Sequence, residues 1–486
     1  MATGRSPSSR PPGTVGVRGW VVRDVEDDWN TQNIAARARA LTPDLVGELE
    51  RLAAVPSIAF PGFPPHEVIR AHDHVVRMLT EAGVRDVGAI RLPDTPPVIT
   101  GSIPAPEGAP TVLLYAHYDV QPPGDEALWR TPPFAPAPFD EDGEKGIRAR
   151  GIADDKSNIL AHVGAIRAWN GRPPVGIKIV IEGAEEWGSP LDEYPARRPG
   201  EFQADAMAVA DMGNIRAGQP TLTVGLRGVA DVIVEVRTLE GAKHSGNFGG
   251  PAPDAMLALV RALSSLHDDN GDVAVAGLRR EPWTGATYTD VEFGEAVGAE
   301  PGMPLLGTGT LGERLWSGPA ITVTGIDAIP VDKAAGACVP HARAKINLRI
   351  HPAQPAREAR EALIRHLEAQ RPFGIPLTVS VAGEAGDGYR AETGGPAMEA
   401  MTAAMRAAYG TDPVQMAAGG AIPLVSALHR AVPKAEILLF GAQDGKCNLH
   451  APNERVLVSE LENTVVAEAL FFAEFAARWS PAGEMS

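Results

Sequence analysis

Cysteine is almost absent from this chain. Its 486 residues include only two, Cys338 and Cys447, so no disulfide framework can support the fold. Basic residues are also in deficit, because 44 Lys and Arg face 61 Asp and Glu and leave a net charge of −17. This balance argues against nucleic acid or an anionic membrane as a partner.

Long apolar segments are missing as well. No stretch is long and apolar enough to span a bilayer, and the first residues lack the apolar core of a signal peptide. We therefore expect no membrane association and, by default, a cytoplasmic enzyme. A chain of this length can form two or three domains with substantial cores. Residues 1–30, rich in Pro, Ser and Gly, are predicted to be a flexible tail.

The most informative motif is an apolar run that ends in a histidine and an aspartate. Residues 111–119 read TVLLYAHYD, which is typical of a buried strand, and His117 and Asp119 are two positions apart. Alternate residues of a strand share a face, so both side chains point the same way. An imidazole can bind a metal through one ring nitrogen while a carboxylate holds the other N–H. An isolated motif of this kind is more often an ordinary strand-end histidine, so other residues must decide.

Two further segments present carboxylates where an apolar pattern meets a turn. Asp154 and Asp155 precede a helical pattern, where acids could simply stabilise the start of the helix. Asp211 follows the short apolar strand pattern of residues 206–210. Each is a candidate metal ligand once the others are considered with it.

A β-branched run at residues 175–182 leads into the adjacent glutamates Glu185 and Glu186. If this segment stays extended, the two side chains face opposite ways. One glutamate can then bind a metal while the other faces the substrate as a base.

His450 lies far downstream, in a loop after the buried strand pattern of residues 436–440. Four strand-like segments therefore carry His, Asp or Glu at their C-terminal ends, where open α/β sheets place their ligand sites. His450 adds a second imidazole to this set. Together these residues predict a metal-dependent active site.

In these motifs and their order, the chain resembles the M20 family of metallopeptidases. That family includes carnosinase-like dipeptidases, aminoacylases, succinyl-diaminopimelate desuccinylase and glutamate carboxypeptidase. The resemblance extends over residues 41–479 and rests on five separate motifs. It implies a hydrolase that cleaves the amide bond of a dipeptide or short peptide with a hydroxide bridging two divalent metal ions.

The resemblance also implies a role for each residue. One metal would be held by His117, Asp154 and Asp211, and the other by Asp154, Glu186 and His450, so that Asp154 bridges the two ions. Glu185 would be the general base, and Asp119 would orient His117. The peptide bond between Asp154 and Asp155 would be cis.

The charges of such a site balance. Two divalent ions bring four positive charges, which three ligand carboxylates and one hydroxide neutralise. Mixed nitrogen and oxygen ligands suit Zn²⁺ best, and Mn²⁺ or Co²⁺ also fit. Cys447 and His450 are spaced like half of a zinc finger, but no second pair exists, so we interpret Cys447 as a bystander. His72 and His74 are two apart in a helical pattern and are interpreted as surface residues.

The positions of the candidate ligands predict the domain organisation. His117 to Asp211 and His450 must share one domain, so the segment between them is an insertion. We expect an α/β protein with a zinc-peptidase-like catalytic domain, formed by residues 31–225 and 392–486 around a mostly parallel sheet. Residues 226–391 show a βαββαβ-like series and are predicted to form a smaller ferredoxin-like α/β sandwich, a lid or dimerisation domain. Residues 278–315, rich in Gly and Pro, have no assignment.

The predicted insertion contains two candidate functional residues. His244 lies in a glycine-rich loop, and the resemblance implies that it stabilises the oxyanion, commonly in the active site of a partner subunit. Arg349 ends a strand pattern and matches the family's arginine for the free C-terminal carboxylate of the substrate. A small peptide substrate and a homodimer follow from these two assignments.

The substrate class can be narrowed at two places. Asp211 stands where dipeptidases and aminopeptidases of the family usually have Asp and the other branches have Glu. The segment with Gly420 and Ala421 resembles a substrate-binding Gly-Gly-Ser-Ile-Pro loop, with Ala421 in place of the serine. We therefore expect a dipeptidase, and the alternatives are an N-acyl-amino-acid deacylase or a non-catalytic peptide-binding descendant. The retained Glu185 argues against the non-catalytic alternative.

Overall fold

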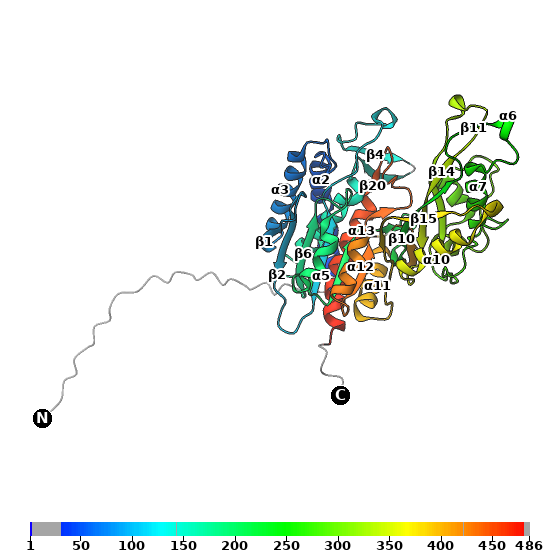
Figure 1. Ribbon diagram of the computed structural model, residues 1–486. Helices are drawn as coiled ribbons and strands as arrows, with labels where there is room; N and C mark the ends of the chain where they lie inside the picture. The colour runs from blue at the N-terminus through cyan, green and yellow to red at the C-terminus, as the bar shows by residue number, and fades with distance from the viewer. Residues whose placement is uncertain (2–30, 142, 421, 481–486) are drawn as a thin grey trace, which may run out of the picture.

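The computed structural model describes residues 31–141, 143–420 and 422–480, together with Met1. Within these ranges the chain forms two main hydrophobic cores, each built around its own sheet. Figure 1 shows the larger sheet with helices on both sides and the smaller sheet beside it. The predicted tail at residues 1–30 falls almost entirely outside the described residues, as does Ala421.

The larger sheet has nine strands in the described part of the chain. Its path is β1-β2-β6-β3-β7-β18-β9-β16, and β17 also pairs with β9. The four strands β6, β3, β7 and β18 run parallel, whereas β1, β2, β9 and β16 join antiparallel. The bounds are β1 (Arg85–Ile90), β2 (Val98–Ile103), β3 (Thr111–His117), β6 (Gly176–Glu182), β7 (Ala206–Ala210), β9 (Thr221–Leu226), β16 (Tyr389–Arg390), β17 (Val414–Ala418) and β18 (Glu436–Phe440).

Burial on both faces explains the composition of the parallel strands. β7 is AMAVA with every residue buried, and β3 is buried from Val112 to His117. Parallel strands covered by helices on both sides read as continuous apolar runs rather than as an alternation. The expected α/β fold is therefore confirmed, with the refinement that parallel strands form the centre of the sheet and antiparallel strands its flanks.

The helices around this sheet include two that carry much of the core. α4 (Ser157–Ala168) packs against the long α13 (Val458–Arg478), and α13 packs against α11 (Pro396–Tyr409). α4 is buried on nearly all sides, which explains why its sequence lacks a polar face. The remaining helices are α1 (Thr31–Ala40), α2 (Thr42–Ala53), α3 (Pro65–Glu81), α5 (Tyr194–Arg197) and α12 (Pro423–Ala431).

The smaller sheet has the antiparallel order β12-β14-β10-β15. Its elements follow the chain as β10 (Gly228–Arg237), α7 (Ala255–Leu263), β12 (Ala320–Asp327), β14 (His341–Ile350), α10 (Ala356–Ala369) and β15 (Thr378–Gly386). In β14 every second residue is buried, as expected for a sheet with helices on one face only. The predicted βαββαβ order is confirmed, whereas its role as a lid or dimerisation domain stays a prediction.

Two segments bear on how the two sheets join. Thr221–Leu226 is strand β9 of the larger sheet, and the chain crosses to the smaller sheet at Arg227. The unassigned segment at 278–315 includes α8 (Asp290–Ala296) and α9 (Leu311–Leu315). Trp283 and Tyr288 of this segment pack with Trp316 against Ala417, so part of the predicted insertion covers the edge of the larger sheet.

The sheet to which β16 belongs indicates where the chain returns from the smaller sheet to the larger one. β16, at the end of the predicted insertion, belongs to the larger sheet. We therefore propose that the second crossing lies just before Tyr389, close to the predicted limit at 391. None of the helices in the described ranges combines the length and apolar character that a membrane span needs.

Candidate metal centre and active site

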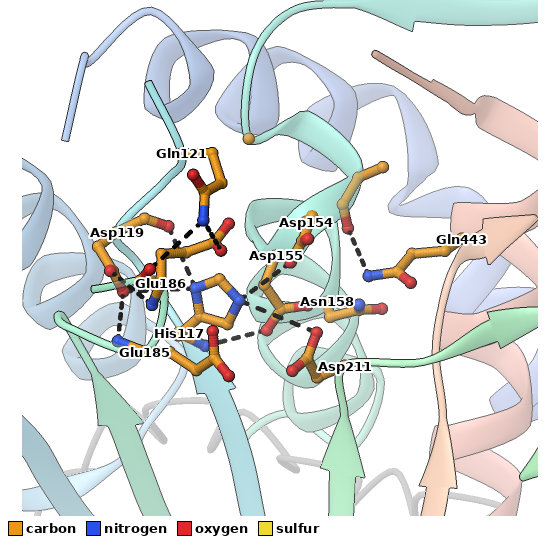
Figure 2. Close-up of polar contacts among 12 residues, drawn as sticks. His117, Asp119, Gln121, Asp154, Asp155, Asn158, Glu185, Glu186, Asp211 and Gln443 are labelled. Carbon is orange, nitrogen blue, oxygen red and sulfur yellow. Dashed lines mark hydrogen bonds and ion pairs between the residues drawn. The ribbon is translucent and has the colours of Figure 1, made fainter. Parts of the chain in front are cut away.

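The candidate metal ligands meet at the C-terminal edge of the parallel strands. His117 is the last residue of β3, and Asp211 follows β7 directly. Glu186 lies in the turn after β6, and Asp154 lies in the irregular turn of residues 152–156 that leads into α4. His450 comes from the loop after β18. Figure 2 shows all of these except His450 directed toward one another.

The distances define two overlapping groups. Nε2 of His117 lies 3.0 Å from Oδ1 of Asp154 and 3.9 Å from Oδ1 of Asp211. Nε2 of His450 lies 3.0 Å from Oδ2 of Asp154 and 3.1 Å from Oε2 of Glu186. Asp154 thus presents one oxygen to each imidazole, which is the arrangement that a bridging ligand requires.

These spacings fit a pair of metal ions. Ligand atoms around a tetrahedral Zn²⁺ are each about 2.0–2.1 Å from the ion, which puts them about 3.3 Å from one another. The nitrogen-to-oxygen distances of 3.0 to 3.9 Å therefore need only small adjustments. The donor set has imidazole and carboxylate groups and no thiolate, since Cys447 is buried and its Sγ accepts the amide N–H of Asp444.

Asp155 could also serve as a ligand by distance alone, because its carboxylate lies close to the imidazole of His117 and the carboxylate of Asp211. Its two oxygens are already engaged, however. Oδ2 accepts the amide N–H of His117 at 2.9 Å, and Oδ1 accepts an N–H of Asn158 at 2.5 Å. We therefore assign Asp155 to holding the end of β3. The peptide bond between Asp154 and Asp155 is cis, as the family resemblance implied.

Asp119 contacts the ring of His117, as the sequence indicated, but its main-chain oxygen lies closer to the ring than its carboxylate does. Nδ1 lies 3.1 Å from the main-chain oxygen of Asp119 and 3.4 Å from its carboxylate. That carboxylate instead accepts the amide N–H groups of Glu185 and Glu186, both at 3.1 Å. Asp119 therefore connects the end of β3 with the turn that carries both glutamates.

The two glutamates occupy a turn and not the extended segment that we expected. Gly188, the residue that closes this turn, donates its amide N–H to the main-chain oxygens of Ala184 and Glu185. The side chains still diverge: Figure 2 shows Glu186 directed toward Gln121 and Glu185 on the other side of the His117 ring. Nε2 of Gln121 donates to Oε2 of Glu186 at 2.8 Å and fixes its position.

The electrostatics of the cluster follow from burial and crowding. Burial, reinforced by the neighbouring carboxylates of Glu186 and Asp154, raises the pKa of Glu185 to about 8. Hydrogen bonds with His117 and His450 outweigh burial and hold the pKa of Asp154 well below its usual range. Hydrogen bonds to Asp154 and Glu186 raise the pKa of His450 to about 10. Buried acids crowded in this way attract cations strongly.

Glu454 supports the turn that carries Asp154, a role that no sequence motif indicated. It is fully buried, and Oε2 accepts from Arg150 at 2.7 Å and from the amide of Gly151 at 2.8 Å. Oε1 accepts the amides of Ala153 and Asp154 at 2.9 and 3.1 Å. One carboxylate therefore fixes the backbone from Gly151 to Asp154, and the φ of 74° at Gly151 makes the turn.

Glu454→Gln is expected to destabilise the fold and to lower metal affinity. The amide has one oxygen and no charge, so Arg150 is left buried without its anion, and breaking such a pair costs about 3 to 5 kcal/mol. Chemical denaturation and metal analysis would measure the two effects. The matched control is Glu462→Gln, whose partner Arg39 is half-exposed, so this change should cost about 1 kcal/mol or less. Equal costs for both variants would show that Glu454 does not support the site.

Three other predicted residues are not brought to this cluster. His244 is exposed in the two-residue strand β11 (Lys243–His244), and its Nδ1 accepts the amides of Gly246 and Asn247 in α6 (Ser245–Phe248). Figure 1 shows β11 and α6 at the outer end of the smaller sheet. Arg349 is half-buried in β14, where it pairs with Val229 and Ala320. Gly420 is exposed and precedes α12.

Gln121 and Glu454 are the residues that sequence reasoning missed at the site. Gln121 lies two positions after Asp119, a spacing that could have suggested a shared role. Glu454 lies four positions after His450, but nothing in the sequence pairs it with a turn some 300 residues earlier. Such contacts depend on the tertiary fold and have no local signal.

Comparison with known proteins agrees with this geometry. The model of the peptidase family M20/M25/M40 matches residues 113–474. The cysteinylglycine-S-conjugate dipeptidase of Corynebacterium striatum is 36% identical over 375 residues, which cover 76% of this chain and 81% of the relative. The human Beta-Ala-His dipeptidase is 28% identical over 433 residues, which cover 84% of each chain.

The fold agrees as well. The crystal structure of human carnosine dipeptidase 1 matches with a TM-score of 0.73 and 25% identity, covering 92% of this chain and 99% of that one. The family model spans most of the chain, including His117 and His450. This chain therefore belongs to the M20/M25/M40 family of peptidases and is a metallopeptidase.

Proposed function

We propose that this chain hydrolyses dipeptides that have a free C-terminal carboxylate, in a reaction that depends on two divalent metal ions. The observation that carries this proposal is the position of Asp154 between two imidazoles, with Glu185 at the same edge of the sheet. A cluster that only binds metal has no need for an additional carboxylate that forms no ion pair with either imidazole.

His117, Asp154 and Asp211 would hold one ion, and Asp154, Glu186 and His450 the other. Bound ions would polarise the scissile carbonyl and lower the pKa of the attacking water. We propose Zn²⁺ as the metal, because the ligands are nitrogen and oxygen donors, with Mn²⁺ and Co²⁺ as candidates that the same set accepts.

Glu185 would move the protons of the reaction. Its carboxylate would take a proton from the attacking water and deliver it to the leaving nitrogen as the C–N bond breaks, so that a neutral amine departs. Burial and the neighbouring carboxylates raise the pKa of Glu185 to about 8 in the absence of metal, and two bound cations would lower this pKa, so that the carboxylate could accept the proton near neutral pH. Asp119 holds the amides of Glu185 and Glu186 and so keeps the base and one metal ligand at a fixed separation.

The names of the relatives direct the choice of substrate. One relative is named for S-conjugates of cysteinylglycine, and another for β-Ala-His. We propose a dipeptide with glycine or another small C-terminal residue, and cysteinylglycine and its S-substituted derivatives are the first substrates to assay. Arg349 would pair with the terminal carboxylate through its planar guanidinium.

The test is a metal-dependent hydrolysis assay. The purified chain, stripped with a chelator, would be reloaded with Zn²⁺, Mn²⁺ or Co²⁺ and offered Cys-Gly, β-Ala-His, Ala-Gly and N-acetyl amino acids. We expect the stripped protein to be inactive, and the reloaded protein to prefer dipeptides. Preference for the N-acetyl amino acids would identify a deacylase, and no hydrolysis with any metal would refute the proposal.

We also propose that two chains assemble so that His244 of each one completes the active site of the other. Within one chain, His244 is exposed at the far end of the smaller sheet and contacts none of the candidate ligands among the described residues. In a partner's site, its imidazole could donate a hydrogen bond to the oxygen that becomes negative in the transition state.

Complementation between inactive variants would test this assembly. His244→Ala and Glu185→Gln should each have low activity, and mixing equal amounts under conditions of statistical subunit exchange should restore about a quarter of the wild-type activity. Recovery is expected because each mixed dimer has one site with both residues intact. Light scattering would establish the dimer, and tagged subunits would establish exchange. Exchange without recovery would place His244 outside the partner's site.

A further inference from the structure

Two large apolar side chains that adjoin candidate metal ligands in the sequence are exposed, although the centre itself is polar. Trp187 follows Glu186 directly and is 52% exposed, and Leu449 precedes His450 and is 40% exposed. Since His450 and Glu186 are 3.1 Å apart, these two apolar residues adjoin the same pair of ligands. Large apolar side chains left exposed beside a polar site are a common sign of ligand binding.

A second segment adds to this surface. The ring of Phe60 packs against that of Trp187, with centroids 4.9 Å apart and an angle of 57° between the planes. Phe63, in the same loop, is 38% exposed, and its amide N–H bonds to the main-chain oxygen of Phe60. We refer to Phe60, Phe63, Trp187 and Leu449 as the apolar rim.

The rim is held in place by the elements that build the metal centre. Trp187 belongs to the turn whose amides at Glu185 and Glu186 bond to Asp119. The loop of Phe60 is tied to the same strand end, because Ser57 donates its hydroxyl to the oxygen of Tyr118 and accepts the amide of Val120 at its own oxygen. The two rings therefore have fixed positions relative to the candidate base, as a specificity site requires.

The position of Leu449 has a backbone cause. Asn448 and His450 on either side of it have φ values of 55° and 57°, in the left-handed region that residues other than glycine seldom adopt. This conformation turns His450 toward Asp154 and Glu186 and leaves Leu449 exposed to solvent. Leu449 is therefore exposed, although the burial of a leucine side chain is normally favourable.

We infer that the apolar rim binds the side chain of the substrate's N-terminal residue and selects dipeptides in which that side chain is large and apolar, aromatic or S-substituted cysteine. The inference rests on the proposed function, which places the C-terminal carboxylate at Arg349 on the smaller sheet. The scissile carbonyl then lies at the metal centre, and the other end of the dipeptide lies over the loops of the larger sheet that carry the rim. An aromatic pair recognises such groups through apolar contact and ring stacking.

The experiment compares dipeptides that differ only in the N-terminal side chain. We expect kcat/KM of the zinc-loaded wild type to increase in the order Ala-Gly, Leu-Gly and Phe-Gly, with S-benzyl-Cys-Gly at least equal to Phe-Gly. Trp187→Ala should lower the ratio of kcat/KM for Phe-Gly to that for Ala-Gly roughly 10-fold, because the apolar contact is lost for one substrate only. Trp187→Phe should retain most of the ratio, and Phe60→Ala should lower it in the same direction.

The controls separate this effect from loss of structure. Phe373→Ala removes a 69% exposed ring from the smaller-sheet part of the chain and should leave the ratio unchanged. Metal content and molecular mass would be measured for every variant. A wild type that hydrolyses all the dipeptides without regard to side-chain size would overturn the inference alone, whereas no hydrolysis at all would overturn the proposed function. A Trp187→Ala protein with an unchanged ratio but a lower molecular mass would show that the rim is a subunit interface instead.

Discussion

Glu185→Gln is expected to lower kcat by about 10²-fold or more while metal content stays near that of wild type. The amide cannot accept a proton from the attacking water, and a positioned base contributes about 10² to 10⁴ to the rate. The fold should persist, because the interaction that fixes this residue in its turn is its own amide N–H bonding to Asp119, which the substitution preserves. Steady-state kinetics with Ala-Gly and metal analysis of the same preparation would measure both quantities.

The adjacent residue supplies the matched control. Glu186→Gln changes the same functional group one position away, but Oε2 of Glu186 lies 3.1 Å from Nε2 of His450. We therefore expect this variant to lose one of two metal ions, with the loss of activity partly reversed by excess metal. If Glu185→Gln kept most of its activity, another group would have to be the base.

The sequence could predict that the candidate ligands lie together, because most of them lie at or near the end of an apolar strand pattern. His117 is the last residue of β3, Asp211 follows β7 directly and Glu186 lies in the turn after β6, and the parallel arrangement of these strands brings their C-terminal ends to one edge. The same logic predicted the α/β fold and the βαββαβ order of the smaller sheet. In each case an apolar pattern of defined period ended at a turn or a polar residue.

The remaining features depend on contacts that no local pattern records. Glu454 fixes a turn some 300 residues away in the sequence, and Asp155 holds the amide of His117. The segment with Trp283 and Trp316 had an unusual composition, but only the tertiary fold determines that these rings pack on Ala417. The role that we propose for His244 involves a second chain, and no local pattern in the sequence of one chain indicates such a contact.

Arg349→Met is expected to lower kcat/KM for a dipeptide roughly 30-fold to several thousand-fold. Removing one partner of a desolvated, hydrogen-bonded charge pair costs about 2 to 5 kcal/mol, and every 1.4 kcal/mol corresponds to tenfold. Arg349 is half-buried in β14 and has no ion pair among the described residues, and the buried Arg227 lies close enough for the two cations to repel each other. An anion from the substrate would relieve the repulsion between these two cations.

The loss should depend on the substrate's carboxylate. A dipeptide amide never forms the ion pair, so Arg349→Met should reduce its hydrolysis much less than that of the free acid. Arg343→Met provides the control, because Arg343 lies on the same strand and the same face but is exposed and paired with Asp327. That variant should hydrolyse both substrates like wild type. An equal loss by Arg349→Met on the acid and the amide would assign Arg349 to the structure of the smaller sheet, and recognition of the free C-terminus would then need another cation.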